Sequence, residues 1–180
     1  EGEDLLLRVR RYLASRSIAL ALKGVPGLYI HGALGTSNDH ARVRETGAVR
    51  EMNRVVVDGE KLECEMADPE SKLSLVTGSA NRFYAIRTQL RAFHPRGGQR
   101  VLDVGPQVFA ILRTSPEGSE AVLAAVNVTG RLRAARIRSV PPPFGRRHWI
   151  DLLTERRFEA RGGVLDVRFA PYEVLWLKPE

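Results

Sequence analysis

Apolar residues follow helical spacing in the first part of the chain and strand spacing in the last part. After Asp4, apolar positions recur at three- and four-residue steps as far as Leu20, and Gly24 and Pro26 end the pattern. These features predict a helix with Asp4 as its N-cap. Its second half is apolar all round, which is typical of a helix buried on most sides.

A short apolar run, Val25–Ile30, follows between two glycines and predicts a strand of a parallel α/β unit. Such strands are buried on both faces and need neighbouring strands. The polar residues 32–54 come next and include a predicted short charged helix around Asp39–Glu45. In α/β barrels the loops after the strands build the active-site face, so we look for function in this loop.

A second helix is predicted after a further polar stretch. Asp68 and Pro69 are the expected N-cap and first helical residue, and apolar residues recur from Leu73 to Phe93 at three- and four-residue steps. The amphipathic pattern ends before the Pro-Arg-Gly-Gly sequence at 95–98. We place a domain boundary there, with residues 1–96 in one domain and residues 97–180 in the other.

From Gln99 onward the pattern changes to short apolar or alternating runs separated by turn residues. Several strands at this spacing predict an antiparallel β-sandwich. The predicted strands are Arg100–Val104, Val108–Thr114, Ala121–Thr129, Leu132–Arg138, Trp149–Leu153, Val164–Phe169 and Glu173–Leu177.

The formal net charge of +7 raises the possibility of a basic nucleic-acid-binding protein. The densest basic stretch, Arg131–Arg138, alternates with apolar residues and has no interleaved aromatics for base stacking. We therefore expect a solvated strand face and no nucleic-acid partner. No apolar run reaches the roughly 20 residues that a membrane span requires, so no membrane association is expected. The single cysteine, Cys64, and the absence of a signal-peptide pattern favour a cytoplasmic protein.

Several motifs together resemble the end of an α-amylase-family chain of the sucrose phosphorylase and glucosylglycerate phosphorylase type. The motifs are residues 24–32 (GVPGLYIHG), 35–39 (GTSND), 45–47 (ETG), 50–54 (REMNR), 83–87 (FYAIR), 92–95 (AFHP) and 171–177 (PYEVLWL). The resemblance implies the last helices and the eighth strand of a (β/α)8 barrel, followed by an antiparallel β-sandwich domain.

The resemblance also implies a retaining glucosyl transfer to phosphate by double displacement. An Asp nucleophile, a Glu general acid/base and a supporting Asp carry out this reaction in the family. The resemblance places these carboxylates in the barrel before this chain begins. We therefore expect no catalytic residue and no activity in this chain alone, with the missing N-terminal barrel as its partner. Sugar and inorganic phosphate are the implied substrates, no cofactor is implied, and the acceptor and a possible homodimer stay open.

By the resemblance, Arg50 is the residue that reaches toward the transferred sugar. Its guanidinium offers a rigid fork of donors for sugar hydroxyls or phosphate. Asn38 and Asp39 are expected to line the acceptor side of the pocket. Each has a plainer interpretation: Arg50 as an exposed loop residue, and the Asn-Asp pair as a turn and helix cap.

Two further groups of residues offer alternatives. His31 and His40 with Asp39 lack a third ligand at useful spacing, so no metal site is expected. Trp149 and Trp176 suggest a sugar-stacking platform, which would make the β-domain a non-catalytic carbohydrate-binding module. Both lie among aliphatic residues in strand-like runs, which favours core packing instead.

Overall fold

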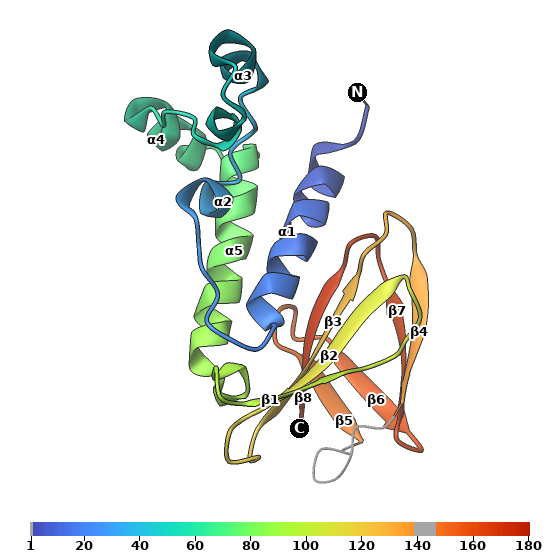
Figure 1. The fold of residues 1–180 in the computed structure, drawn as a ribbon. Coiled ribbons are helices and arrows are strands. Elements are labelled where there is room, and N and C mark those ends of the chain that lie inside the picture. The colour runs from blue at the N-terminus through green and yellow to red at the C-terminus, as the bar shows by residue number, and fades with distance from the viewer. Residues whose placement is uncertain (1, 139–146) are drawn as a thin grey trace. The chain divides into compact units, whose positions relative to one another are not determined.

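The C-terminal part of the chain forms one eight-stranded antiparallel sheet in the computed structural model, which describes residues 2–138 and 147–180. The strand order is β1-β2-β3-β8-β5-β6-β7-β4 (Figure 1). The strands are β1 Gly98–Val101, β2 Val108–Thr114, β3 Ala121–Asn127, β4 Arg133–Arg138, β5 His148–Asp151, β6 Arg157–Arg161, β7 Val164–Phe169 and β8 Val174–Pro179. The chain divides into two compact units, residues 1–26 with 82–180, and residues 27–81.

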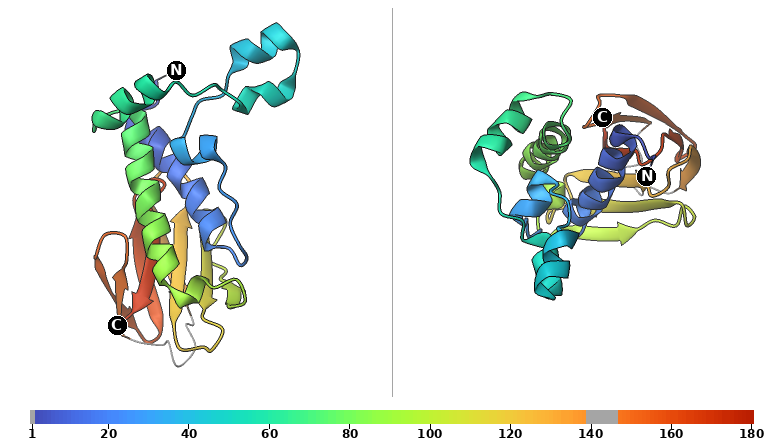
Figure 2. Two further views of the ribbon diagram at one scale, coloured as in Figure 1. Left: turned by 90° about the vertical axis from the view of Figure 1, so that its left-hand side faces the viewer. Right: turned by 90° about the horizontal axis from the view of Figure 1, so that it is seen from above.

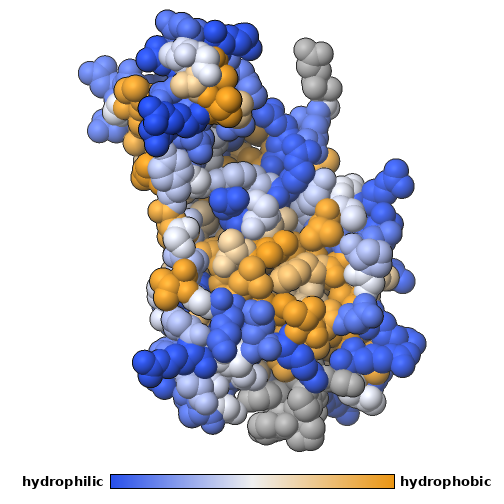
Figure 3. Space-filling model, viewed as in Figure 1, coloured by the Kyte–Doolittle hydropathy of each residue, from blue (hydrophilic) through white to orange (hydrophobic). Residues whose placement is uncertain are grey.

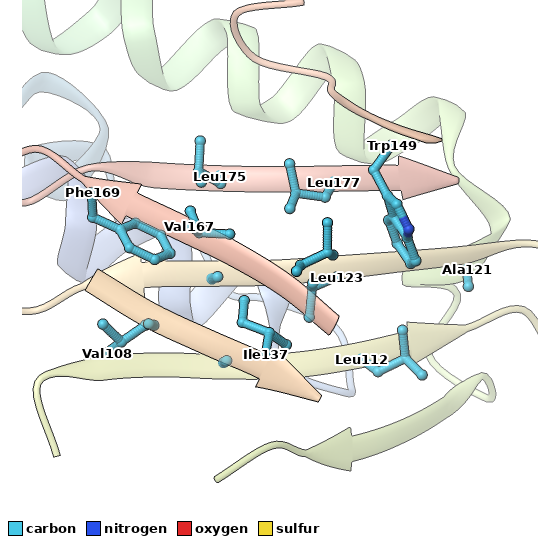
Figure 4. Close-up of a cluster of buried hydrophobic side chains, with 14 residues drawn as sticks. Val108, Leu112, Ala121, Leu123, Ile137, Trp149, Val167, Phe169, Leu175 and Leu177 are labelled. Carbon is cyan, nitrogen blue, oxygen red and sulfur yellow. The ribbon is translucent and has the colours of Figure 1, made fainter. Parts of the chain in front are cut away.

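The sheet curls over a core to which strands from both ends of its order contribute. Leu112 of β2 and Leu123 of β3 share one cluster of buried side chains with Ile137 of β4 and Val167 of β7 (Figure 4). Alternate residues of each strand point into this cluster, as the two-residue period of a strand requires. The sequence-based prediction of an antiparallel sandwich-like β-domain is confirmed.

Helix α1 (Leu5–Ala21) packs on the opposite face of the same sheet. All seven residues of β3 are buried because the core cluster covers one face and α1 covers the other (Figure 2). The predicted N-cap is confirmed, since the Asp4 carboxylate accepts a 3.2 Å hydrogen bond from the Leu7 N–H. The helix therefore belongs to the same unit as the sheet.

Trp176 of β8 packs against the helical layer of this unit. Its ring lies 5.4 Å from that of Phe83 in the C-terminal part of α5 (Lys72–Gln89) and 4.8 Å from that of Phe93 in η2 (Arg91–Phe93). Both distances are typical of tilted aromatic pairs.

Figure 3 shows apolar side chains (orange) gathered over the sheet with hydrophilic side chains (blue) around them.

Arg113 of β2 is fully buried and holds three chain segments together. Its guanidinium donates to three backbone carbonyls, those of Ala21 at 2.8 Å, Gly98 at 3.0 Å and His94 at 3.0 Å. Arg87 donates to the neighbouring carbonyl of Leu20 at 2.8 Å. Two cations thus satisfy carbonyls at the C-terminal end of α1, where the helix dipole favours positive charge. Burial lowers the pKa of both arginines, and at Arg113 the charge of Arg87 adds to the effect.

The unit formed by residues 27–81 is helical. Its elements are α2 Ile30–Leu34, α3 His40–Thr46, η1 Val49–Asn53, α4 Gly59–Ala67 and the first part of α5 (Figure 1). The short helix predicted around Asp39–Glu45 is confirmed as α3. Helix α4 was not predicted, although Asp58 caps it by accepting a hydrogen bond from the Lys61 N–H at 3.2 Å.

The prediction of a strand at Val25–Ile30 is wrong: the structure has no strand there. Residues 25–29 form no helix or strand, and Ile30 begins α2. Val25 is 82% exposed and Leu28 is 57% exposed. A parallel strand needs hydrogen-bonded neighbours on both sides, and the described residues place none beside this segment.

The start of α5 and one strand of the sheet also differ from prediction. Helix α5 begins at Lys72, and the hydroxyl of Ser71, rather than Asp68, accepts the hydrogen bond from the Ser74 N–H at 3.0 Å. Asp68 instead accepts from the N–H of Glu70 in the preceding turn at 2.9 Å. Strand β6 was missed because its sequence, RFEAR, contains no apolar run.

Candidate functional site

The loop from Thr36 to Arg54 brings the predicted site residues into one substructure. The backbone N–H of Asp39 donates a 2.7 Å hydrogen bond to the carbonyl of Met52, which ties the start of α3 to η1. Asn38 directly precedes Asp39, and Arg50 lies two residues before Met52. The three predicted residues therefore share one small lobe, although within the described part of the chain no hydrogen bond joins their side chains.

Asp39 has a clear structural role in this lobe. Its carboxylate accepts a 2.8 Å hydrogen bond from the Arg42 N–H and so caps α3. This is the helix-cap interpretation of the Asn-Asp pair. One carboxylate oxygen is engaged in the cap, and Asn38 beside it is exposed.

Arg50 is an exposed and weakly held cation of the lobe. Its side chain is 77% exposed, and its Nε lies 3.9 Å from the Glu51 carboxylate, at the outer limit of an ion pair. An exposed ion pair at this distance holds the side chain weakly. The guanidinium can therefore turn toward a ligand without breaking a strong interaction.

The base of the lobe is anchored by Tyr29. Its hydroxyl donates a 3.2 Å hydrogen bond to the carbonyl of Asn53, at the end of η1. Gly47, with φ of +68°, ends α3 in the left-handed region that glycine adopts at low cost. These two features set the path of the chain between α3 and Arg50.

Sequence reasoning missed a pocket in the same unit. A pocket of about 460 Å³ lies between residues 34–37, residues 55–65 and the start of α5. Lys61, Glu65 and Lys72 line it, and the Lys72 ammonium donates to the Ser37 hydroxyl at 3.0 Å. Arg50, Asn38 and Asp39 are not among the lining residues. The pocket was not foreseen because one wall is α4, which the sequence pattern did not reveal.

The structure decides between the two interpretations of the tryptophans. Trp149 is 1% exposed and Trp176 is 0% exposed, so neither ring can act as a surface platform for sugars. Core packing is confirmed, and the carbohydrate-binding-module alternative loses the residues on which it rested.

Within residues 2–138 and 147–180, no group of three or more His, Cys, Asp or Glu side chains is arranged to hold a metal ion.

In the part of the chain that the structure describes, no helix is both long and apolar enough to cross a bilayer.

Within β4, buried Ala135 and Ile137 alternate with exposed Arg136 and Arg138. The prediction that the basic stretch at 131–138 is a solvated strand face is therefore confirmed.

Comparison with known proteins gives clear relatives. No family model matches the chain. Glucosylglycerate phosphorylase of Spirochaeta thermophila is 36% identical over 188 residues, covering 98% of this chain and 31% of that protein. The protein of the same name from Allomeiothermus silvanus is 34% identical over 177 residues, covering 98% of this chain and 28% of its own length. The chain thus spans about a third of the length of the curated relatives it matches.

Solved structures share the fold over nearly the whole chain. An Anoxybacillus α-amylase matches with a TM-score of 0.70 and 13% identity, covering 97% of this chain and 33% of that one. The α-amylase of Geobacillus thermoleovorans, complexed with acarbose, matches with a TM-score of 0.69 and 14% identity, covering 98% and 34%.

The fold is that of the C-terminal region of α-amylase-family enzymes. Over 98% of its length the chain is a homologue of the C-terminal part of proteins named glucosylglycerate phosphorylase. The resemblance recognised in the sequence motifs is thereby confirmed.

Proposed function

We propose that this chain is the C-terminal portion of a retaining α-glucosyl phosphorylase. The enzyme would cleave a glucosylglycerate-like glucoside, or sucrose, with inorganic phosphate and release glucose 1-phosphate. The single observation that carries the proposal is 36% identity over 98% of the chain to a glucosylglycerate phosphorylase. In this proposal the chain supplies no catalytic carboxylate, and a preceding barrel segment supplies them all.

Residues 1–96 would complete the barrel, and residues 97–180 would form the C-terminal β-domain. The exposed apolar residues Val25, Leu28 and Ile30 support this division. An uncovered apolar segment marks an interaction site, and strands of the preceding barrel would cover it. In the complete enzyme we therefore propose that residues 25–30 become the eighth barrel strand, which they do not form here.

The lobe at 36–54 would then lie at the carboxyl end of that strand, where barrel enzymes place their active sites. Arg50 would hold the transferred glucosyl unit or the incoming phosphate. Asn38 and Asp39 would face the acceptor. The weak hold of Glu51 on Arg50 supports a ligand-binding role, because a positioned guanidinium forms short, charge-assisted hydrogen bonds with anions. We propose a cytoplasmic location and no nucleic-acid partner.

The experiment is a phosphorolysis assay on the complete protein encoded by the gene. Glucosylglycerate and sucrose are each incubated with inorganic phosphate, and glucose 1-phosphate is measured. We expect product from one of these glucosides and none from the 180-residue chain alone. Release of free glucose without glucose 1-phosphate would show a hydrolase and would overturn the phosphorylase assignment.

A further inference from the structure

The sheet presents an exposed face rich in arginine. Residues of β4, β6 and β7 alternate between the core and solvent, and the paired registers place the outward residues side by side. The outward charged residues are five arginines, Arg136, Arg138, Arg157, Arg161 and Arg168, and two carboxylates, Glu159 and Asp166. We name these five arginines the arginine face.

Two members of the arginine face form no close ion pair with a described residue, although the hydrogen bond from Arg136, with a contribution from the charge of Arg138, lowers the pKa of Asp166. Asp166 pairs with Arg136 at 2.9 Å, and Glu159 pairs with Arg161 at 3.3 Å. Among the described residues no carboxylate lies within ion-pair distance of Arg138 or Arg168. Residues 139–146, which the structure does not describe, contain no Asp or Glu.

A segment of the other unit has the opposite charge. Residues 58–70, which we name the acidic segment, contain six carboxylates and one lysine, in a chain whose overall charge is +7. They include α4, which has no buried residue. Glu60 and Glu63 are exposed, lie one turn apart on α4, and have no ion-pair partner among the described residues.

The dimensions of the two charged surfaces agree. In the register of β4 with β7, Arg168 faces Ala134, so Arg138 lies four residues farther along the strand, about 13 Å away. The nine residues of α4 also span about 13 Å. Glu60 and Glu63 lie only about 4.5 Å apart along the helix axis and can face one arginine, whereas Glu60 and Asp68 lie eight residues apart, about 12 Å, so the acidic segment can offer carboxylates to both arginines.

We propose that the arginine face binds the acidic segment of a second copy of this chain. The contact is heterologous, because one surface of each copy meets a different surface of the next. The face has no Trp, Tyr or Phe pointing outward for base stacking, which favours a carboxylate partner over a single-stranded nucleic acid. Exposed ion pairs are individually weak and are screened by salt, so the association is weak and salt-sensitive.

The test is sedimentation velocity on the 180-residue chain at about 20 mM and about 500 mM NaCl, where the screening length differs several-fold. We expect self-association at low salt that is lost at high salt. A face variant, Arg138→Glu with Arg168→Glu, and a segment variant, Glu60→Lys with Glu63→Lys, should each weaken self-association at least tenfold. An equal mixture of the two variants should recover it, because each reversed surface then meets its complement.

The matched control is Arg8→Glu with Arg10→Glu on the exposed side of α1, which changes the net charge as the face variant does. It should weaken self-association by less than the face variant does. Circular dichroism confirms that each variant is folded. A chain that stays monomeric at low salt, or a mixture that fails to associate, overturns the proposal. Binding of labelled oligouridine that needs Arg138 and Arg168, with no self-association, would assign the face to nucleic acid instead.

Discussion

The carboxylate of Asp151 accepts a 2.8 Å hydrogen bond from the backbone N–H of Trp176, inside the sheet and out of contact with solvent. Its other oxygen accepts a 2.6 Å hydrogen bond from the hydroxyl of Thr154. Buried carboxylates are rare unless they are hydrogen-bonded in this way. The pair joins the end of β5 to the centre of β8.

Asp151→Ala should destabilise the chain by about 1–3 kcal/mol, because it leaves the buried N–H of Trp176 without an acceptor. Urea unfolding followed by tryptophan fluorescence measures the change. Asp166→Ala is the control, since its ion pair with Arg136 is exposed on both sides and should contribute under about 1 kcal/mol. Equal losses in the two variants would show that the buried hydrogen bond is of no special importance.

Arg113→Met keeps much of the side-chain volume and removes the donors to three carbonyls. Hydrogen bonds from charged groups contribute about 1.5–3 kcal/mol each and do not add fully, so we expect a loss of about 3 kcal/mol or more. Urea unfolding measures the loss, and hydrogen exchange should quicken at the C-terminal end of α1. Arg131→Met, at an exposed position, is the control. Unchanged exchange in α1 would contradict the role given to Arg113.

The ion pair between Glu117 and Arg91 predicts a stability loss in acid. The side-chain hydrogen bond from Arg91 lowers the pKa of Glu117 from 4.5 to about 2. A carboxyl whose pKa is lower in the folded state stabilises the fold above its unfolded pKa, and this contribution is lost as pH falls from 4.5 toward 2. Both side chains are exposed, at 70% for Arg91 and 40% for Glu117, so screening keeps the effect small.

The measurement compares urea midpoints at about pH 6 and about pH 3. Glu117→Gln should lose less stability than the unmodified chain over this interval. Arg91→Met should have the same effect, and the double variant should add nothing further, because both changes remove one pair. An acid loss that is identical in all four proteins would rule out this pair as its source.

Arg50→Ala in the complete enzyme should lower kcat/KM at least roughly tenfold, since it removes hydrogen bonds worth about 1.5–3 kcal/mol each. Arg50→Lys should recover part of the loss, because it keeps the charge but not the planar fork. Arg44→Ala is the control, since Arg44 is also exposed and lies on the same lobe. If Arg50→Ala is no worse than Arg44→Ala, Arg50 is a surface residue.

The elements that were predicted best are those whose pattern depends only on neighbouring residues. Strands β2 and β7 have their predicted bounds, and Asp4 caps α1 as expected, because alternation and capping depend on neighbouring residues. Helix α4 and strand β6 were missed because both consist largely of polar residues: α4 has no buried residue, and β6 directs only the partly buried Phe158 and Ala160 toward the core.

Tertiary context decides the features that a local pattern cannot show. Residues 25–30 have the composition of a buried parallel strand, yet they lack strand neighbours within the described residues. The link between Asp39 and Met52 joins positions thirteen residues apart, and no spacing rule reveals it. The sequence motif therefore identified Arg50, Asn38 and Asp39 as candidates, while the lobe that gathers them could be seen only in the structure.

Strand β4 lies at one end of the strand order and so presents one row of unpaired backbone groups. Such an edge is a template for uncontrolled strand addition by other chains, and charged side chains on an edge strand oppose it. Arg136 and Arg138 supply that charge, whereas Ala135 and Ile137 hold the strand to the core. Replacement of both arginines by valine would leave three consecutive β-branched residues at the end of an edge strand with one remaining charge at Arg133, so we expect solubility during folding to depend on side chains that point away from the core.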